Sequence, residues 1–264
     1  MSNAAYLTGI RKIEIGTLDK VSCNGVKIKV NSCALCGSDI RIFNSGNDRV
    51  EYPAIIGHEV SGTIVESYSD EFKVGENVSI GGDIPCGNCP ECLNLKPNLC
   101  KKNLAIGYQL KGGFSEYMYL DKEIILNGPF KKIPKEFNLE TACLAEPLAC
   151  AFNGLEKMRI NENAENLLIF GAGPIGIMLG ILAKKVYKVK KIDFVELSEY
   201  RINYLKELDI ANEIIRPEVL EKKFSKYKEK YQFVITACSV LKTHQLGISL
   251  LANGGSINFF GGLS

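Results

Sequence analysis

The sequence predicts an α/β protein with two domains, a β-rich domain at residues 1–150 and a doubly wound parallel-sheet domain at residues 151–264. Three observations lead to this prediction. Glycine-punctuated, strand-like runs fill the first half, and strand and helix patterns alternate after about residue 140. A glycine-rich turn also joins the first strand of the alternating part to its first helix, as in a βαβ unit.

The first half is expected to form a compact antiparallel β domain with long loops. Residues 26–30 alternate apolar and polar side chains, which is the period of a half-buried strand. Residues 59–66 and 77–80 are further β-rich runs, and glycines lie between or beside these runs.

The second half is expected to form βαβ units, which give a parallel sheet with right-handed crossovers. The expected strands are residues 166–170, 191–196, 233–236 and 256–260. The expected helices are residues 139–158, 175–187 and 198–208, the last with Ser198 as its N-cap.

Composition excludes several classes of protein. The formal net charge is +2 and charges are spread along the chain, which leaves no electrostatic footprint for nucleic acid or an anionic membrane. No apolar run reaches the roughly 20 residues of a membrane helix, and the N-terminus lacks the features of a signal peptide. We therefore expect a cytoplasmic protein that acts on a small molecule.

Four of the ten cysteines lie in one short loop with the spacing C-x2-C-x2-C-x7-C. They are Cys86, Cys89, Cys92 and Cys100. Four thiolates without an open position are the ligand set of a structural zinc ion. An iron–sulfur cluster is the main alternative, but its bacterial pattern has a shorter last gap and a proline after the last cysteine, where this chain has Lys101. Four free surface cysteines are a third, weaker alternative.

A second metal site with an open position is expected from a thiolate, an imidazole and a carboxylate. Cys36 follows a strand, and His58 and Glu59 follow a glycine; each segment alone is a weak signal. Such a mixed, incomplete ligand set is typical of catalytic zinc. Glu146, near the expected domain boundary, is a further acid. We expect Cys36 and His58 to bind the metal, and Glu59 and Glu146 to share the third position, one as ligand and the other as an orienting group.

A nucleotide-binding turn is expected where residues 171–176 read G-x-G-x-x-G between an apolar strand and an apolar helix. The candidate cofactor-binding residues in it are Gly171, Gly173, Pro174, Ile175 and Gly176. The helix N-terminus would face the pyrophosphate. Glu196, at the end of the next strand, would bond the ribose 2′-hydroxyl and favour NAD over NADP. Arg201 lies nearby and is a candidate contact, although a solvated helix face is the plainer interpretation.

The remaining chemistry-bearing residues are expected to be structural. Five cysteines in apolar surroundings are interpreted as small buried hydrophobic residues: Cys23, Cys33, Cys143, Cys150 and Cys238. His244 lies in a polar run and is expected on the surface of a helix.

Taken together, these motifs resemble the zinc-dependent medium-chain dehydrogenase/reductase family. The matching elements are residues 36–39, residues 57–59, the four-cysteine loop, residues 145–148 and residues 171–176, in the family order. The Glu146-Pro147-Leu148 element is similar to the sorbitol, threonine and galactitol-phosphate dehydrogenase branch. The resemblance implies a GroES-like catalytic domain, a Rossmann domain and homodimers or homotetramers.

The resemblance also implies an activity. This is the oxidation of a secondary alcohol, a polyol or sugar alcohol with or without a phosphate, to a ketone, with hydride transfer to NAD and two zinc ions per chain. Cys36, His58, Glu59 and Glu146 would surround the catalytic zinc, and Ser38 would relay a proton. The family often has a histidine where this chain has Arg41, so the relay would continue through the cofactor ribose or water.

Two alternatives to a polyol dehydrogenase stay open. One is an L-threonine-type 3-dehydrogenase, for which the sequence shows no convincing partners for the ammonium and carboxylate groups. The other is a truncated, non-catalytic chain that binds zinc and a dinucleotide. This alternative arises because family members continue with another strand and a segment that returns to the catalytic domain. The Rossmann domain is therefore expected to be incomplete at residue 264. The dimer surface is expected to depend on the missing segment.

Overall fold

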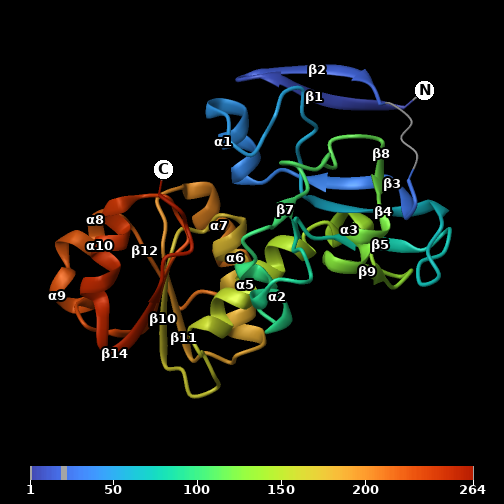
Figure 1. The fold of residues 1–264 in the computed structure, drawn as a ribbon. Helices are drawn as coiled ribbons and strands as arrows, with labels where there is room; N and C mark the ends of the chain where they lie inside the picture. The colour runs from blue at the N-terminus through green and yellow to red at the C-terminus, as the bar shows by residue number, and fades with distance from the viewer. Residues whose placement is uncertain (1, 19–22, 264) are drawn as a thin grey trace. The chain divides into compact units, whose positions relative to one another are not determined.

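The structure is a computed structural model that describes residues 2–18 and 23–263 (Figure 1). The chain divides between Glu146 and Pro147 into two compact units, close to the boundary expected near residue 150. Within the described residues, no helix is both long and apolar enough to cross a membrane.

The first unit is built on an antiparallel sheet with the strand order β8-β3-β4-β5-β9. The strands are β3 (Val26–Ala34), β4 (Glu59–Ser67), β5 (Asn77–Ile80), β8 (Tyr117–Leu120) and β9 (Phe130–Ile133). Strands β3 and β4 pair with two register shifts, and Ala34 lies opposite Glu59. The alternating apolar residues of these strands form one core, which includes Val26, Ile28 and Val60. Alternation therefore predicts the antiparallel sheet correctly.

Shorter elements surround this sheet. A hairpin of β1 (Asn3–Gly9) and β2 (Lys12–Thr17) is paired antiparallel, and β6 (Asp83–Ile84) pairs with β7 (Leu104–Ala105). The helices are α1 (Gly37–Ser45), α2 (Pro90–Leu93), the 3-10 turn η1 (Pro97–Leu99), α3 (Lys122–Asn127) and α4 (Leu139–Ala142).

The second unit is built on a parallel sheet with the strand order β12-β11-β10-β13-β14. The strands are β10 (Asn166–Phe170), β11 (Lys191–Val195), β12 (Glu213–Ile215), β13 (Tyr231–Thr236) and β14 (Leu251–Asn258). Phe170, the last residue of β10, lies opposite Val195 on one side and Thr236 on the other. The carboxyl ends of the three central strands therefore lie together at one edge, where such sheets bind ligands.

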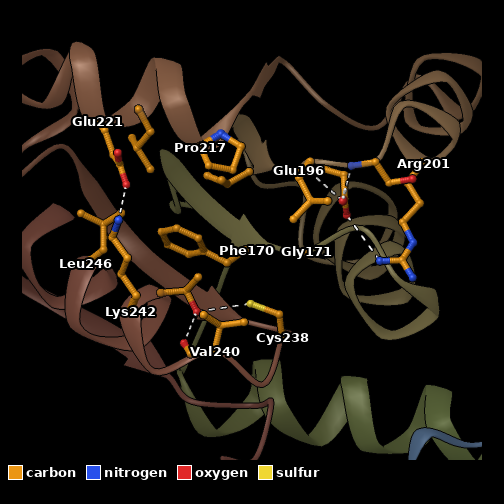
Figure 2. Close-up of a pocket in the computed structure, with 15 residues that line it drawn as sticks. Phe170, Gly171, Glu196, Arg201, Pro217, Glu221, Cys238, Val240, Lys242 and Leu246 are labelled. Atoms are coloured by element: carbon orange, nitrogen blue, oxygen red, sulfur yellow. Dashed lines mark hydrogen bonds and ion pairs between the residues drawn. The ribbon is translucent and has the colours of Figure 1, made fainter.

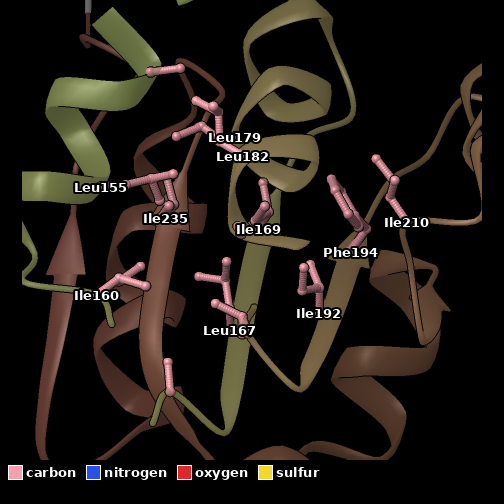
Figure 3. Packing of buried hydrophobic residues seen from close by; sticks show 14 of the residues in the cluster. Leu155, Ile160, Leu167, Ile169, Leu179, Leu182, Ile192, Phe194, Ile210 and Ile235 are labelled. Carbon is pink, nitrogen blue, oxygen red and sulfur yellow. The ribbon is translucent and has the colours of Figure 1, made fainter. Parts of the chain in front are cut away.

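Helices cover both faces of the parallel sheet. They are α5 (Ala145–Lys157), α6 (Pro174–Lys185), α7 (Glu199–Leu208), α8 (Pro217–Lys222), α9 (Phe224–Tyr227) and α10 (Leu241–Leu250). Leu167 and Ile169 of β10 pack with Leu179 of α6 on one face, shown in Figure 3. Leu168 and Phe170 alternate with them and pack with α8, α9 and α10 on the other face. Because both faces are covered, β10 is apolar throughout, which is why the sequence shows a continuous run.

Three local expectations are wrong. Residues 139–158 form two helices, α4 and α5, instead of one. Cys150 is exposed, because the buried face of α5 carries Pro147, Ala151 and Gly154 and leaves Cys150 outside it. His244 is 8% exposed, because α10 turns His244, Gly247 and Leu250 toward the protein while the adjacent Lys242 and Gln245 face solvent.

A buried carboxylate lies within the second unit. Asp193 of β11 accepts hydrogen bonds from the Tyr231 hydroxyl at 2.8 Å and from Lys230 Nζ at 3.1 Å. The Asp193 side chain is 6% exposed and that of Lys230 is 32% exposed. A buried charge costs free energy unless it is paired, so this ion pair fixes the loop before β13 against β11.

Lys230→Met is therefore expected to lower the free energy of unfolding by roughly 2–3 kcal/mol, less than the 3–5 kcal/mol of a fully buried pair because Lys230 is partly exposed. The matched control is Lys228→Met, which removes an exposed pair with Glu229 and should cost less than about 1 kcal/mol. Urea unfolding of both variants measures the difference, and equal midpoints would contradict this role for Lys230.

Candidate active site and nucleotide-binding turn

Three candidate metal ligands meet in the first unit. Cys36 is the N-cap of α1. Glu59 is the first residue of β4, and His58 is the last residue of the loop that leads into β4. One ligand atom from each residue lies within 4.8 Å of the others. The chain enters this arrangement at Gly57, whose φ is +96° and where a Cβ would lie 2.7 Å from Cys33 Sγ. Only glycine fits both conditions without strain.

Asp39 ties two of these ligands together. Its Oδ2 accepts a hydrogen bond from the Cys36 N–H at 2.9 Å, and its Oδ1 lies 3.6 Å from His58 Nδ1. The Asp39 residue is 1% exposed. A carboxylate behind one ring nitrogen orients an imidazole so that the other nitrogen faces a metal ion. Asp39 thus pairs electrostatically with His58, without a hydrogen bond to its Nδ1, while it holds the start of α1 through a hydrogen bond.

Electrostatics agree with a site built to hold a cation. Burial by itself lowers the pKa of His58, but the neighbouring Asp39 and Cys36 outweigh it and raise that pKa to about 11. Burial raises the pKa of Glu59, against the opposing influence of Cys36 and His58. A positive charge at this point is therefore favoured by the surrounding anionic groups.

A small cavity of about 150 Å³ adjoins His58. Glu146, Asp83, Arg49 and Tyr108 also line it. Near Cys36, the Oγ atom of Ser38 is buried and has no hydrogen-bond partner among the described residues. A buried hydroxyl without a partner costs free energy unless a ligand supplies the bond. The cavity therefore has room for a small polar molecule, and Ser38, which is not among the residues that line it, retains an unused hydroxyl two residues from Cys36.

The donor set fits a zinc ion. A thiolate, an imidazole and a carboxylate are the ligand types that catalytic zinc takes, with a further position left for water or substrate. The His58 Nδ1 atom faces Asp39, which leaves the other ring nitrogen for a metal ion. Zinc held by Cys36, His58 and Glu59 would supply Lewis-acid chemistry there.

The four-cysteine loop brings its sulfur atoms together. Ligand atoms of Cys86, Cys89, Cys92 and Cys100 lie within 4.8 Å of one another. Cys89 Sγ lies 3.4 Å from Cys92 Sγ and 3.8 Å from Cys100 Sγ. Tetrahedral zinc with bonds of about 2.3 Å separates its sulfur ligands by about 3.8 Å, so the loop fits the ion. The backbone N–H of Asn88 is the main cause that lowers the pKa of Cys86 to about 6.

The glycine turn lies at the carboxyl edge of the parallel sheet. Gly171 has a φ of +92°, and Gly173 is the N-cap of α6, which begins at Pro174. A Cβ at Gly176 would lie 2.0 Å from the Gly171 carbonyl oxygen. The first and third glycines of the motif are therefore required by backbone conformation and by close packing of helix on turn.

Glu196 holds this turn in place. Its Oε2 accepts from the Ala172 N–H at 2.7 Å, and its Oε1 accepts from the N–H groups of Leu197 and Ser198 at 2.8 Å each. Arg201 Nη1 lies 3.7 Å from Oε2. Figure 2 shows both side chains at one end of a cavity of about 560 Å³ that Gly171 and Phe170 also line. A cavity of this size is typical of a small-molecule site.

Comparisons with known proteins show the family to which the chain belongs. Residues 23–130 match the alcohol dehydrogenase GroES-like domain. A D-altritol 5-dehydrogenase from Agrobacterium fabrum is 32% identical over 239 residues, which cover 89% of this chain and 68% of that protein. The chain belongs to the zinc-dependent medium-chain dehydrogenase/reductase family. It falls in the branch of polyol and threonine dehydrogenases.

Solved structures agree with the family fold. An alcohol dehydrogenase (rspB) from Escherichia coli CFT073, solved with NADH, has a TM-score of 0.84 at 28% identity and covers 98% of this chain and 76% of that one. A zinc-binding dehydrogenase from Sinorhizobium meliloti 1021, solved with NADP, has a TM-score of 0.89 at 23% identity and covers 100% and 77%. Across several other curated relatives, the chain spans 54 to 68% of their length.

As a member of this family, the chain brings most of its expected site residues together. Cys36, His58 and Glu59 form one group, whereas Glu146 lies outside that group and lines the cavity beside His58. Two residues near this group, Asp39 and Arg49, were not predicted from the sequence. Asp39 lies three residues after Cys36, at the third position of α1, where an acidic side chain commonly accepts a hydrogen bond from the N-cap N–H. This spacing is visible in the sequence and could have identified Asp39. The position of Arg49 depends on long-range folding and had no such signal.

Gly176→Ala is expected to weaken NADH binding at least tenfold, since its Cβ must push the Gly171 carbonyl away and distort the turn. Fluorescence titration with NADH measures the change. The control is Gly9→Ala, because a Cβ there meets no atom within 4 Å. Unchanged NADH affinity in Gly176→Ala would contradict the assignment of this turn to the nucleotide.

Proposed function

We propose that the protein oxidises a secondary alcohol to a ketone and transfers the hydride to NAD. The observation that carries the proposal is the group of Cys36, His58 and Glu59, whose ligand atoms lie within 4.8 Å of one another. Two zinc ions per chain are proposed, one at this group and one at the four-cysteine loop. The reaction balances because the alcohol loses a hydride to NAD⁺ and a proton to the protein, giving ketone, NADH and H⁺.

The side chains have separate roles in this proposal. The cavity beside His58 would hold the substrate, and the Ser38 hydroxyl would accept the substrate's proton while it gives its own proton to water or to the cofactor ribose. Asp39 keeps His58 in one tautomer and orientation. Glu146, at the cavity wall, orients the substrate or a bound water. Hydride transfer itself is the chemistry of the nicotinamide and needs only positioning from the protein.

NAD is the proposed cofactor. The Glu196 carboxylate lies at the end of β11, where an acid accepts from the ribose 2′-hydroxyl and repels a 2′-phosphate. Each of its oxygens already accepts backbone N–H groups, yet a carboxylate has about four acceptor sites and retains capacity. Arg201 would favour a 2′-phosphate, but its guanidinium lies beside Glu196 and is partly neutralised by it.

The proposed substrate is a polyol, in keeping with the D-altritol 5-dehydrogenase relative. An L-threonine-type substrate is the second candidate. The cavity beside His58 offers it both a cation, Arg49, and carboxylates, Asp83 and Glu146, for the carboxylate and ammonium groups of an amino acid.

The cytoplasm is the proposed compartment. Free cysteines such as those of the four-cysteine loop are typical of a reducing compartment.

Cys36→Ser is expected to abolish NADH formation from a panel of polyols, at least a thousandfold, while NADH affinity stays within twofold. The reason is that the variant removes a thiolate ligand and leaves the glycine turn intact. Cys150→Ser is the matched control, since Cys150 is exposed and lies outside both metal groups. Turnover by Cys36→Ser at the wild-type rate would exclude a metal role for Cys36.

A further inference from the structure

The cavity beside His58 contains a cation that has no role in the proposed oxidation of a polyol. Arg49 lies in the loop after α1 and reaches the same cavity as His58 and Glu146. Its guanidinium Cζ lies 5.1 Å from the centroid of the Tyr108 ring, and that ring lies 6.1 Å from the ring of His58. The Tyr108 ring thus lies near both Arg49 and His58, a candidate metal ligand.

The loop that carries Arg49 is held in one conformation. The side-chain oxygen of Asn47 accepts from the Arg49 N–H at 2.9 Å, and the Asn47 carbonyl accepts from the Val50 N–H at 2.9 Å. Val50 is 7% exposed and packs with Leu7 and Ile42 in a hydrophobic cluster. The turn and its buried anchor hold the backbone of Arg49 beside the cavity, so little backbone entropy is left to lose on binding.

The Arg49 residue is exposed, and its guanidinium retains hydrogen-bonding capacity. Its Nη2 donates to Gln109 Oε1 at 3.2 Å, and the same Oε1 accepts from the Ala105 N–H at 3.1 Å. Since a guanidinium carries five N–H donors, several remain for a ligand in the cavity.

The other polar groups of the cavity decide which ligand suits these donors. Asp83 and Glu146 are acidic, and Asp83 Oδ1 accepts from Asn103 Nδ2 at 2.6 Å. Two carboxylates in a cavity of about 150 Å³ disfavour a phosphate dianion, and Arg49 together with a bound metal ion disfavours an ammonium group. A hydroxyl group both donates and accepts, so neighbouring hydroxyls satisfy the guanidinium and the carboxylates at once.

We propose that Arg49 is a specificity-determining residue that donates hydrogen bonds to hydroxyl groups of a neutral polyol beyond the reacting carbon. This inference rests on the proposed function, because it takes the reacting carbon to lie beside His58. It narrows the substrate class to alcohols with at least one further hydroxyl next to the reacting one. Phosphorylated polyols and amino acids are then expected to bind more weakly than neutral polyols.

The test compares Arg49→Met with wild type in the zinc-loaded protein by calorimetric binding of sorbitol and D-altritol against 2-hexanol. The ratio of hexitol affinity to 2-hexanol affinity should fall about 10- to 100-fold, the range for loss of a charge-assisted hydrogen bond. Arg49→Lys should restore part of that ratio. The control is Arg11→Met, whose guanidinium also bonds an amide, Asn44, but does not line this cavity.

Several outcomes overturn the inference. They are an equal loss for hexitols and 2-hexanol, a loss confined to sorbitol 6-phosphate or L-threonine, and an absence of hexitol binding in the wild type. An assay of NADH formation with the same alcohols tests the proposed function separately. Selective hexitol binding without turnover would support the role of Arg49 and contradict the dehydrogenase activity.

Discussion

The buried carboxylate of Asp39 is the contact on which the candidate active site depends. It joins the start of α1, through the Cys36 N–H, to the loop that carries His58. These segments are more than 20 residues apart in sequence, and their functional atoms must converge to within a few ångströms. A carboxylate that is 1% exposed is stable only when it is hydrogen-bonded or paired, so Asp39 itself enforces the convergence.

The second unit uses the same device at its nucleotide-binding turn. Glu196 is 4% exposed and accepts three backbone N–H groups, one of them from Ala172 in the turn. In both places a buried acid fixes backbone next to the position of a ligand. The glycines then provide room, because Gly176 allows the Gly171 carbonyl to approach and Gly57 allows the turn before His58. Both candidate ligand sites therefore depend on backbone that is held in place by a buried carboxylate.

Local patterns in the sequence predicted the strands in which the order of apolar and polar residues matches the order of buried and exposed positions. The expected strands 77–80 and 166–170 match β5 and β10 residue for residue, and the spacing of the four cysteines reflects a loop that folds on itself. The β1–β2 hairpin was missed because β2 is largely exposed and carries no alternation of burial. His244 and Cys150 were assigned to the wrong side because the phase of a helix is set by the sheet it packs against.

Long-range geometry explains the rest of what the sequence left open. Whether Glu59 or Glu146 approaches Cys36 depends on how β3 and β4 pair, and the register that sets Ala34 opposite Glu59 brings Glu59 to the group. Arg49 reaches the cavity because a loop closes on the buried Val50 and on Tyr108, contacts that no local pattern encodes. Chemistry-bearing residue types were predictable, whereas their partners were not.

Asp39→Asn provides the most direct test of the account, because it keeps the hydrogen bond to the Cys36 N–H and removes the charge behind His58. Zinc content and competitive chelation would be measured on wild type and variant. We predict that the wild type binds two zinc ions. In the variant, the affinity for the zinc ion at Cys36 and His58 should be 10- to 100-fold weaker, the usual range for loss of a carboxylate behind a ligating histidine. The zinc affinity of the four-cysteine loop should not change. Equal affinities in both proteins at both sites would contradict the central claim.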